Sequence, residues 1–130
     1  MQKLQNPLSV LLVEDNVLNQ KLIFLNLSKY GFIIDIANNG QEALDKLEVN
    51  TYDLILMDLM MPIMDGLETT VAIRDQEKIT KKHMPIIGLT ANTYDADRDK
   101  CLAYGMDEYM AKPFDLKEFF TNITNLGLIK

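Results

Sequence analysis

The sequence lacks the features that mark secreted and membrane-spanning chains. Its 130 residues hold one cysteine, Cys101, so no disulfide can form within the chain and nothing indicates an oxidising compartment. We expect this thiol to be buried and structural. No apolar run approaches the ~18 residues that span a bilayer, and the first apolar run stops at Glu14, too soon for a signal peptide. These absences predict a cytoplasmic location, either of a free protein or of the soluble part of a larger membrane protein.

Basic residues are also scarce. The formal net charge is −6, and no run of lysine or arginine is longer than Lys81-Lys82. Nucleic acids and anionic membrane surfaces are therefore not expected as direct partners. The hydrophobic fraction of 48% is ordinary for a globular protein. The length suits one domain, for which we predict residues 8–127, between an N-terminal extension over 1–7 and a C-terminal tail over 128–130.

The most informative stretch is a short apolar run that ends in an acid. Residues 54–57 are all apolar, Asp58 follows them, and Pro62 and the pair Asp65-Gly66 come shortly after. An apolar run closed by an acid and then a proline is typical of a buried strand with an exposed carboxyl end. We therefore predict a central strand whose tip carries Asp58.

Other segments alternate between strand and helix signals. Further strands are expected at 8–13, 32–37, 85–89 and 108–111, and Asp35 favours an edge position for the second of them. Helices are expected between the strands, and the polar and basic segment 77–83 is expected to be a loop. Alternation of this kind predicts an α/β fold in which right-handed crossovers join parallel strands and helices cover both faces.

The helix signals are of two kinds. Leucines recur at helical spacing within residues 16–30, namely Leu18, Leu22 and Leu25. Residues with good N-cap side chains mark three further helix starts: Asn39, Asp65 and Asp115. Another helix is expected over residues 93–104, closed by Gly105.

Polar side chains follow the ends of four predicted strands. They are Glu14 and Asp15, Asp58, Thr90, and Lys112. In parallel sheets the ligand site lies outside the carboxyl ends of the strands, so these groups are expected on one rim. Three neighbouring carboxylates need a cation, and hard oxygen ligands suit Mg²⁺. An amine and a hydroxyl suit phosphoryl oxygens, and a carboxylate can be the nucleophile. The pattern indicates phosphoryl transfer to an aspartate.

These residues resemble the response-regulator receiver domains of two-component signalling. The matching stretches are 13–16 (VEDN), 57–66 (MDLMMPIMDG), 89–92 (LTAN) and 111–114 (AKPF). The pair Asn19-Gln20 and the stretch 101–109 (CLAYGMDEY) most resemble the receiver domains of hybrid sensor histidine kinases. The resemblance implies a doubly wound, flavodoxin-like fold, with a five-stranded parallel sheet in the order 2-1-3-4-5.

The resemblance also implies roles for the acidic residues. Asp58 matches the phosphorylated aspartate. Glu14 and Asp15 match the acidic pair that holds Mg²⁺, and Asp58 and the backbone carbonyl of Met60 complete the protein ligands. Glu14 stands where an aspartate is commoner and keeps the charge.

Further roles follow for the other side of the site. Lys112 matches the lysine that contacts the phosphoryl group, and its bond to Pro113 is expected to be cis. Thr90 matches a switch hydroxyl, and Tyr109 matches the aromatic residue that moves with it. Met60 and Asn92 occupy positions where the dephosphorylation rate is tuned.

The resemblance implies partners as well. The phosphoryl donor is a phosphohistidine on a sensor histidine kinase or a phosphotransfer domain, and phosphate can pass on to a histidine phosphotransfer domain. The domain is expected to promote its own phosphorylation and dephosphorylation, as a monomer or weak dimer, either alone or within a membrane-bound hybrid kinase. Phosphorylation is expected to change the face made by the fourth helix, the fifth strand and the fifth helix. We expect helix 16–30 and the rim near Asp58 to dock the partner.

Alternative functions make different demands on the sequence. A magnesium-dependent aspartyl-phosphate phosphatase of the haloacid-dehalogenase type typically has a second aspartate at position 60, where this chain has Met60. A flavodoxin-type module needs a phosphate-binding loop after the first strand, where the Glu14-Asp15 pair would repel phosphate. A pseudo-receiver that only binds partners usually lacks one of the site residues. Taken singly, each site residue also has an ordinary structural explanation, such as N-capping by the acids.

Overall fold

The computed structural model describes residues 7–91 and 95–129. The strands are β1 (Ser9–Val13), β2 (Ile33–Ala37), β3 (Leu54–Asp58), β4 (Ile86–Thr90) and β5 (Glu108–Ala111). The helices are α1 (Val17–Ser28), α2 (Gly40–Val49), α3 (Gly66–Thr80), α4 (Asp95–Ala103) and α5 (Leu116–Asn125). The predicted helix over 93–104 begins within residues 92–94, which lie outside the described part of the chain.

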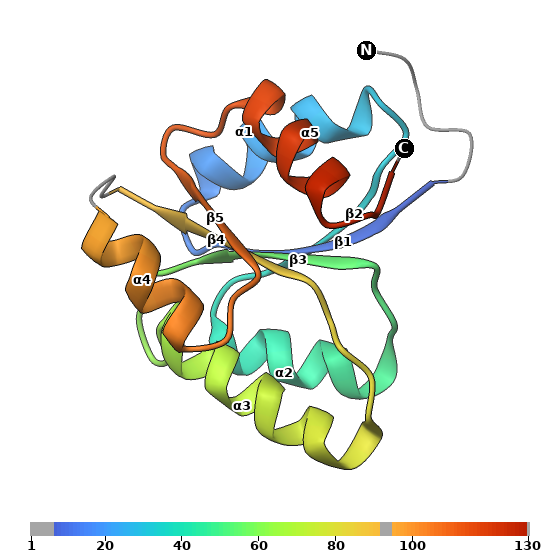
Figure 1. The fold of residues 1–130 in the computed structure, drawn as a ribbon. Helices are drawn as coiled ribbons and strands as arrows, with labels where there is room; N and C mark the ends of the chain where they lie inside the picture. The colour runs from blue at the N-terminus through green and yellow to red at the C-terminus, as the bar shows by residue number, and fades with distance from the viewer. Residues whose placement is uncertain (1–6, 92–94, 130) are drawn as a thin grey trace.

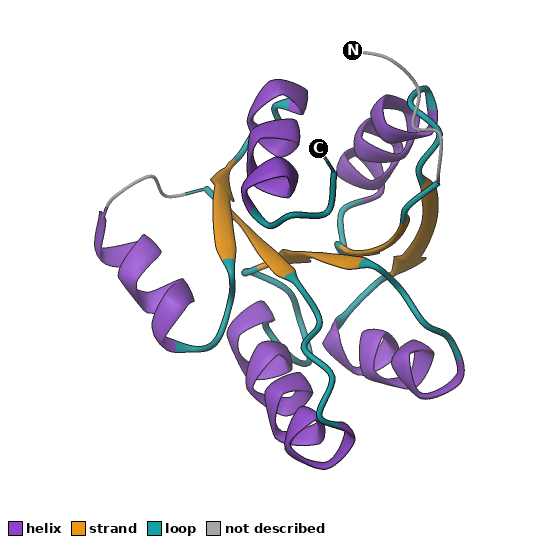
Figure 2. Cartoon of the chain, turned by 45° about the vertical axis from the view of Figure 1, so that its right-hand side comes forward, coloured by secondary structure: helices purple, strands orange, loops and turns teal. Residues whose placement is uncertain are grey.

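The strands form one parallel sheet in the order β2-β1-β3-β4-β5. Helices α1 and α5 cover one face of the sheet, and α2, α3 and α4 cover the other (Figure 1). The same layers are visible around the twisted sheet from a second direction (Figure 2). The predicted fold and strand order are therefore confirmed, and β2, the strand that carries Asp35, lies at an edge as expected.

The core lies on both sides of the central strands. Because neighbouring side chains of a strand point to opposite faces, Val10 and Leu12 pack toward α1 and α5, whereas Leu11 and Val13 pack toward the other three helices. Strands β3 and β4 are buried along their whole length. The Cys101 thiol is buried in the second layer, as predicted. This buried centre fixes the positions of the strand tips.

Side-chain caps set where several helices begin. The predicted caps accept hydrogen bonds from backbone N–H groups of the first turn, and Asn16 does the same for α1. At α3 the cap is reciprocal, because Asp65 and Glu68 each accept from the other's backbone N–H. These local signals are readable from sequence because each involves residues three positions apart.

One local expectation, the extent of the loop over 77–83, is corrected by the structure. Residues 77–80 are helical, so the loop expected over 77–83 begins only after α3 ends at Thr80. Glu77 holds this last turn, since it pairs with Arg74 at 2.8 Å and accepts from the backbone N–H of Met84 at 2.6 Å. Among the described residues, no helix is both long and apolar enough to cross a bilayer.

Helix α1 forms as expected, but the leucines that recur at helical spacing do not face the core. Leu18, Leu22 and Leu25 are 76%, 46% and 61% exposed. The inward face carries Gln20, Ile23 and Leu27 instead. Those three residues are also at helical spacing, so periodicity alone offered two faces. The helix therefore presents an apolar surface to solvent.

Candidate functional site

The strand tips bring the predicted site residues to one rim. In the register of the sheet, Val13 lies opposite Met57 and Asp58 opposite Leu89. Thr90 lies opposite Ala111 in the next pair of strands. Glu14, Asp58, Thr90 and Lys112 therefore leave neighbouring strands at the same edge.

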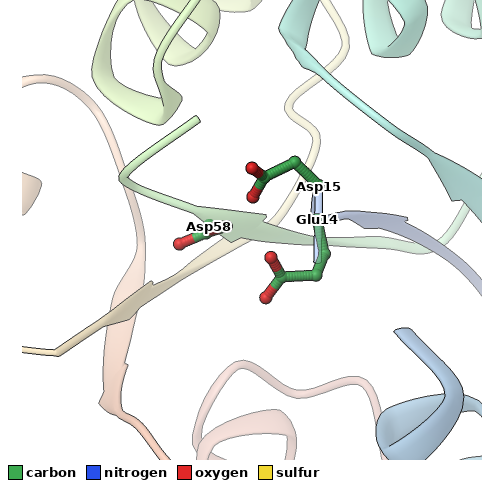
Figure 3. Close-up of side chains that lie close together, drawn as sticks. All are labelled: Glu14, Asp15 and Asp58. Carbon is green, nitrogen blue, oxygen red and sulfur yellow. The ribbon is translucent and has the colours of Figure 1, made fainter. Parts of the chain in front are cut away.

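Three carboxylates cluster at this rim. Oxygen atoms of Glu14, Asp15 and Asp58 lie within 4.8 Å of one another, and the three side chains gather at the ends of β1 and β3 (Figure 3). Glu14 and Asp58 are each 1% exposed, whereas Asp15 is exposed. Two buried acids and an exposed one form a negatively charged site that is open to solvent on one side.

Lys112 supplies the positive charge of the site. Its Nζ lies 2.8 Å from Oδ1 of Asp58 and 3.5 Å from Oε1 of Glu14. Its backbone N–H donates to the carbonyl of Thr90 at 2.7 Å, and its peptide bond to Pro113 is cis, as the resemblance implied. Burial by itself would lower the pKa of Lys112, but Asp58 and then Glu14 raise it on balance, so the amine stays charged.

The acidic cluster fits a hard divalent cation. Among the described residues, Oε1 of Glu14 is a buried side-chain oxygen that no hydrogen bond satisfies. Burial first, and then the nearby Asp58 carboxylate, raise the pKa of Glu14 to about 7. A cation bonded to these oxygens would remove both the unsatisfied acceptor and the repulsion. Carboxylate oxygens are the ligands that Mg²⁺ prefers.

The raised pKa of Glu14 predicts a pH-dependent stability. Glu14 is protonated in the folded state up to about pH 7, but ionises near pH 4.5 when unfolded. Without a cation, its contribution to the free energy of unfolding is therefore full below pH 4.5 and falls as the pH rises to 7, by up to about 3 kcal/mol. Urea unfolding in chelator should show this loss relative to Glu14→Gln, which removes the titration.

The control for that experiment is Glu48→Gln, at an exposed position of α2. This variant should track the wild type at every pH. A wild-type stability that stays parallel to that of Glu14→Gln from pH 4.5 to 7 would contradict the assignment of the raised pKa to Glu14.

The loop after β3 holds the Asp58 carboxylate from its own backbone. The N–H of Met60 donates to Oδ1 of Asp58 at 3.3 Å, while the Met60 side chain is exposed. Gly66, the first residue of α3, donates to the carbonyl of Leu59 at 3.0 Å. A Cβ at Gly66 would lie 2.9 Å from the Leu59 Cα and closer still to the Asp58 carbonyl oxygen. Close backbone packing at this glycine therefore sets the path of the loop.

The two expected switch residues lie at different depths. Thr90 is buried at the tip of β4, and Tyr109 is half-buried in β5, opposite Gly88. The carbonyl of Tyr109 accepts from Asn122 of α5 at 3.5 Å. Asn92 lies outside the described residues.

The structure adds a residue for which the sequence predicted no role. Gln20 is buried in α1 and donates to the backbone carbonyl of Glu14 at 2.6 Å. The one sequence feature that singled out Gln20 was the pair Asn19-Gln20, which resembles the receiver domains of hybrid sensor histidine kinases. Burial of a polar side chain among apolar ones was not visible from the helical spacing.

Comparisons with known proteins agree with this geometry. Residues 10–124 match the family model of the response regulator receiver domain. Hybrid signal transduction histidine kinase I of Dictyostelium discoideum is 47% identical over 116 residues, which cover 85% of this chain and 7% of that protein. The chain spans between 4% and 13% of the length of the curated relatives compared.

Solved receiver domains have the same fold. The receiver domain of the Saccharomyces cerevisiae response regulator Ssk1, solved with the histidine phosphotransfer protein Ypd1, is 35% identical with a TM-score of 0.87, covering 97% of this chain and 92% of that one. The receiver domain of a Pseudomonas aeruginosa sensor histidine kinase, solved with magnesium in its active-site cleft, is 39% identical with a TM-score of 0.80, covering 92% and 97%. The chain therefore belongs to the response regulator receiver domain family of two-component phosphorelays.

Proposed function

We propose that this receiver domain accepts a phosphoryl group on Asp58 from a phosphohistidine of a partner protein. The observation that carries the proposal is the setting of Asp58. Its carboxylate lies beside the acidic pair Glu14 and Asp15 on one side and 2.8 Å from the Lys112 amine on the other. This arrangement combines a nucleophile, a cation site and a fixed positive charge.

The chain's own groups account for the transfer. A carboxylate oxygen of Asp58 forms a bond to phosphorus as the bond from phosphorus to the imidazole nitrogen breaks, and the electron pair stays on that nitrogen. Lys112 is placed to neutralise charge on a phosphoryl oxygen. Glu14, Asp15, Asp58 and the Met60 carbonyl would hold Mg²⁺, which when bound supplies Lewis-acid stabilisation of phosphoryl charge.

The same proposal assigns the response to phosphorylation. The phosphoryl group carries roughly −1.5 to −2 charges, in place of the single negative charge of the Asp58 carboxylate, and brings strong acceptor oxygens. The Thr90 hydroxyl is a donor at the neighbouring strand tip, and its movement, followed by Tyr109, would shift the face formed by α4, β5 and α5 between two states. We also propose that the domain is cytoplasmic and that it is a monomer or a weak dimer, as expected from the sequence.

Acetyl phosphate, a small phosphoryl donor, tests the proposal directly. In the presence of Mg²⁺, the intact mass of the domain should rise by one phosphate, because the site needs no partner residue for the chemistry. In chelator the mass should stay unchanged, since the repulsion among the carboxylates remains. A pseudo-receiver would keep its mass under both conditions, and that outcome would refute the proposal.

Helix α1 is the proposed docking surface for a histidine phosphotransfer domain. It begins directly after the acidic pair, so its first turns lie at the rim of the site. Its exposed apolar side chains have no covering element among the described residues: Val17, Leu18, Leu22 and Leu25. The Ssk1 receiver domain, similar in fold and sequence, was solved in complex with the phosphotransfer protein Ypd1. An apolar helix beside the phosphoacceptor suits such a partner.

Titration of the labelled domain with Ypd1 tests this surface. Amide chemical shifts of residues 16–27 should change. The charged variant Leu25→Glu should weaken binding by at least ten-fold, because it puts an unpaired charge into an apolar contact. Val49→Glu, at another exposed apolar position but on α2, is the control and should bind as the wild type does. Unperturbed shifts over 16–27 in a complex that does form would refute this docking surface.

A further inference from the structure

Buried glutamine Gln20 links the two sides of the sheet next to the acidic pair. It lies in the first turn of α1, and its side-chain Nε2 donates twice, to the Glu14 carbonyl at 2.6 Å and to Oδ1 of Asn38 at 2.8 Å. Asn38 in turn donates to the carboxylate of Glu42, in the first turn of α2. Helices α1 and α2 lie on opposite faces of the sheet (Figure 1). The amide therefore ties both layers to the backbone at the end of β1.

The direction of the Glu14 carbonyl affects the position of Asp15. It belongs to the peptide unit between Glu14 and Asp15, so its direction fixes how Asp15 leaves the end of β1. Other hydrogen bonds hold this turn at different points. The N–H of Glu14 donates to the carbonyl of Ala37 in β2 at 3.0 Å, and the N–H of Asn16 donates to Oε2 of Glu14 at 3.2 Å. Among the described residues, the buried side chain that hydrogen-bonds to the Glu14 carbonyl is that of Gln20.

The Asp15 carboxylate depends on that peptide for its position. It is exposed, and within the described part of the chain it makes no side-chain hydrogen bond or ion pair. Glu14 and Asp58, by contrast, are buried and contact Lys112. Asp15 is thus the member of the acidic cluster whose place is set by backbone direction alone.

We infer that Gln20 is a positioning residue for the cation site: it holds the Glu14–Asp15 peptide so that the Asp15 carboxylate stays within the acidic cluster. The inference deepens the proposed function and rests on it for the identity of the cation. Removing a group that orients a metal ligand commonly weakens metal affinity by ten-fold or more. Gln20 acts on the cation through the backbone and does not touch it.

Magnesium affinity measured by calorimetry without any phosphoryl donor tests this role. Gln20→Met keeps the size of the side chain and removes both N–H donors, so the dissociation constant for Mg²⁺ should rise about ten-fold. Gln20→Ala, which keeps the helix and admits water, is the second variant and should weaken binding similarly. The amide shift of Asp15 should move in both variants before Mg²⁺ is added.

The matched control is Asn122→Leu. Asn122 also has a buried side-chain amide that donates to a backbone carbonyl, but it lies in α5 and its acceptor is the carbonyl of Tyr109. Its loss should lower the melting temperature and leave the Mg²⁺ dissociation constant unchanged. A Gln20→Met or Gln20→Ala domain that folds and binds Mg²⁺ within two-fold of the wild type would overturn the inference. An equal loss of affinity in Asn122→Leu would also overturn it, since the effect would then be general destabilisation.

The result is separable from the fate of the proposed function. If the wild type binds Mg²⁺ and is not phosphorylated, the phosphoacceptor proposal fails, while the affinities of the Gln20 variants still decide the positioning role. If the wild type is phosphorylated and Gln20→Met binds Mg²⁺ as tightly, the positioning role fails alone.

Discussion

Asp58→Asn should take up no phosphate from acetyl phosphate and Mg²⁺ under conditions in which the wild type is fully modified. The amide has the shape of the carboxylate but is not a nucleophile toward phosphorus, and it removes one of the three clustered carboxylates. The fold should persist, because the lost ion pair with Lys112 is offset by relief of the repulsion with Glu14. Intact mass spectrometry measures the uptake, and urea unfolding measures the stability.

A matched control lies at the other end of the same strand. Asp53 directly precedes the amino end of β3, where its carboxylate accepts from the backbone N–H of Ser9 at 2.8 Å. Asp53→Asn should therefore be labelled at the wild-type rate. Equal labelling of Asp58→Asn and the wild type would show that the phosphoryl group is carried elsewhere.

Lys112→Met should slow phosphate uptake by about 100-fold, the usual cost of removing one group that stabilises charge in a transition state. Methionine keeps much of the apolar stem and deletes the amine that lies 2.8 Å from Asp58. Binding of Mg²⁺ should not weaken, because the substitution removes a positive charge that opposes the cation. The time course of intact mass gives the rate, and calorimetry gives the affinity.

Lys117→Met serves as the control, since Lys117 is exposed on α5. It should leave both rate and affinity unchanged. An uptake rate for Lys112→Met within two-fold of the wild type would mean that the amine acts only in the resting ion pair. A loss of Mg²⁺ affinity together with rate would instead indicate a distorted acidic cluster.

The separate behaviour of these variants reflects how the site is built. Asp58 and Glu14 are buried at strand tips, so the sheet itself sets their distance. Lys112 arrives from β5 across one intervening strand. Asp15 is held by its peptide, through Gln20. Nucleophile, countercharge and cation ligand therefore rest on different supports, and each can be removed without the others.

The sequence by itself predicted the strands, their parallel arrangement and the residues at their tips. The order of the strands in the sheet followed from the resemblance to receiver domains. These features are readable because they depend on short-range pattern: an apolar run closed by Asp58, a cap such as Asp65 with Glu68 three residues on, and a polar residue after each run. Once the strands are parallel, their carboxyl ends must meet at one edge. The grouping of Glu14, Asp58, Thr90 and Lys112 follows from that geometry.

Only the tertiary structure decided which face of α1 is buried. Leu18, Leu22 and Leu25 fit a helical stripe as well as Gln20, Ile23 and Leu27 do. Packing against β1 and α5 selects the second stripe, because the helix must enter the sheet layer in the direction that the turn after β1 gives it. The choice leaves leucines exposed beside the site and turns a glutamine inward. The periodic pattern cannot predict which face of α1 is buried, because burial depends on contacts between residues far apart in the chain.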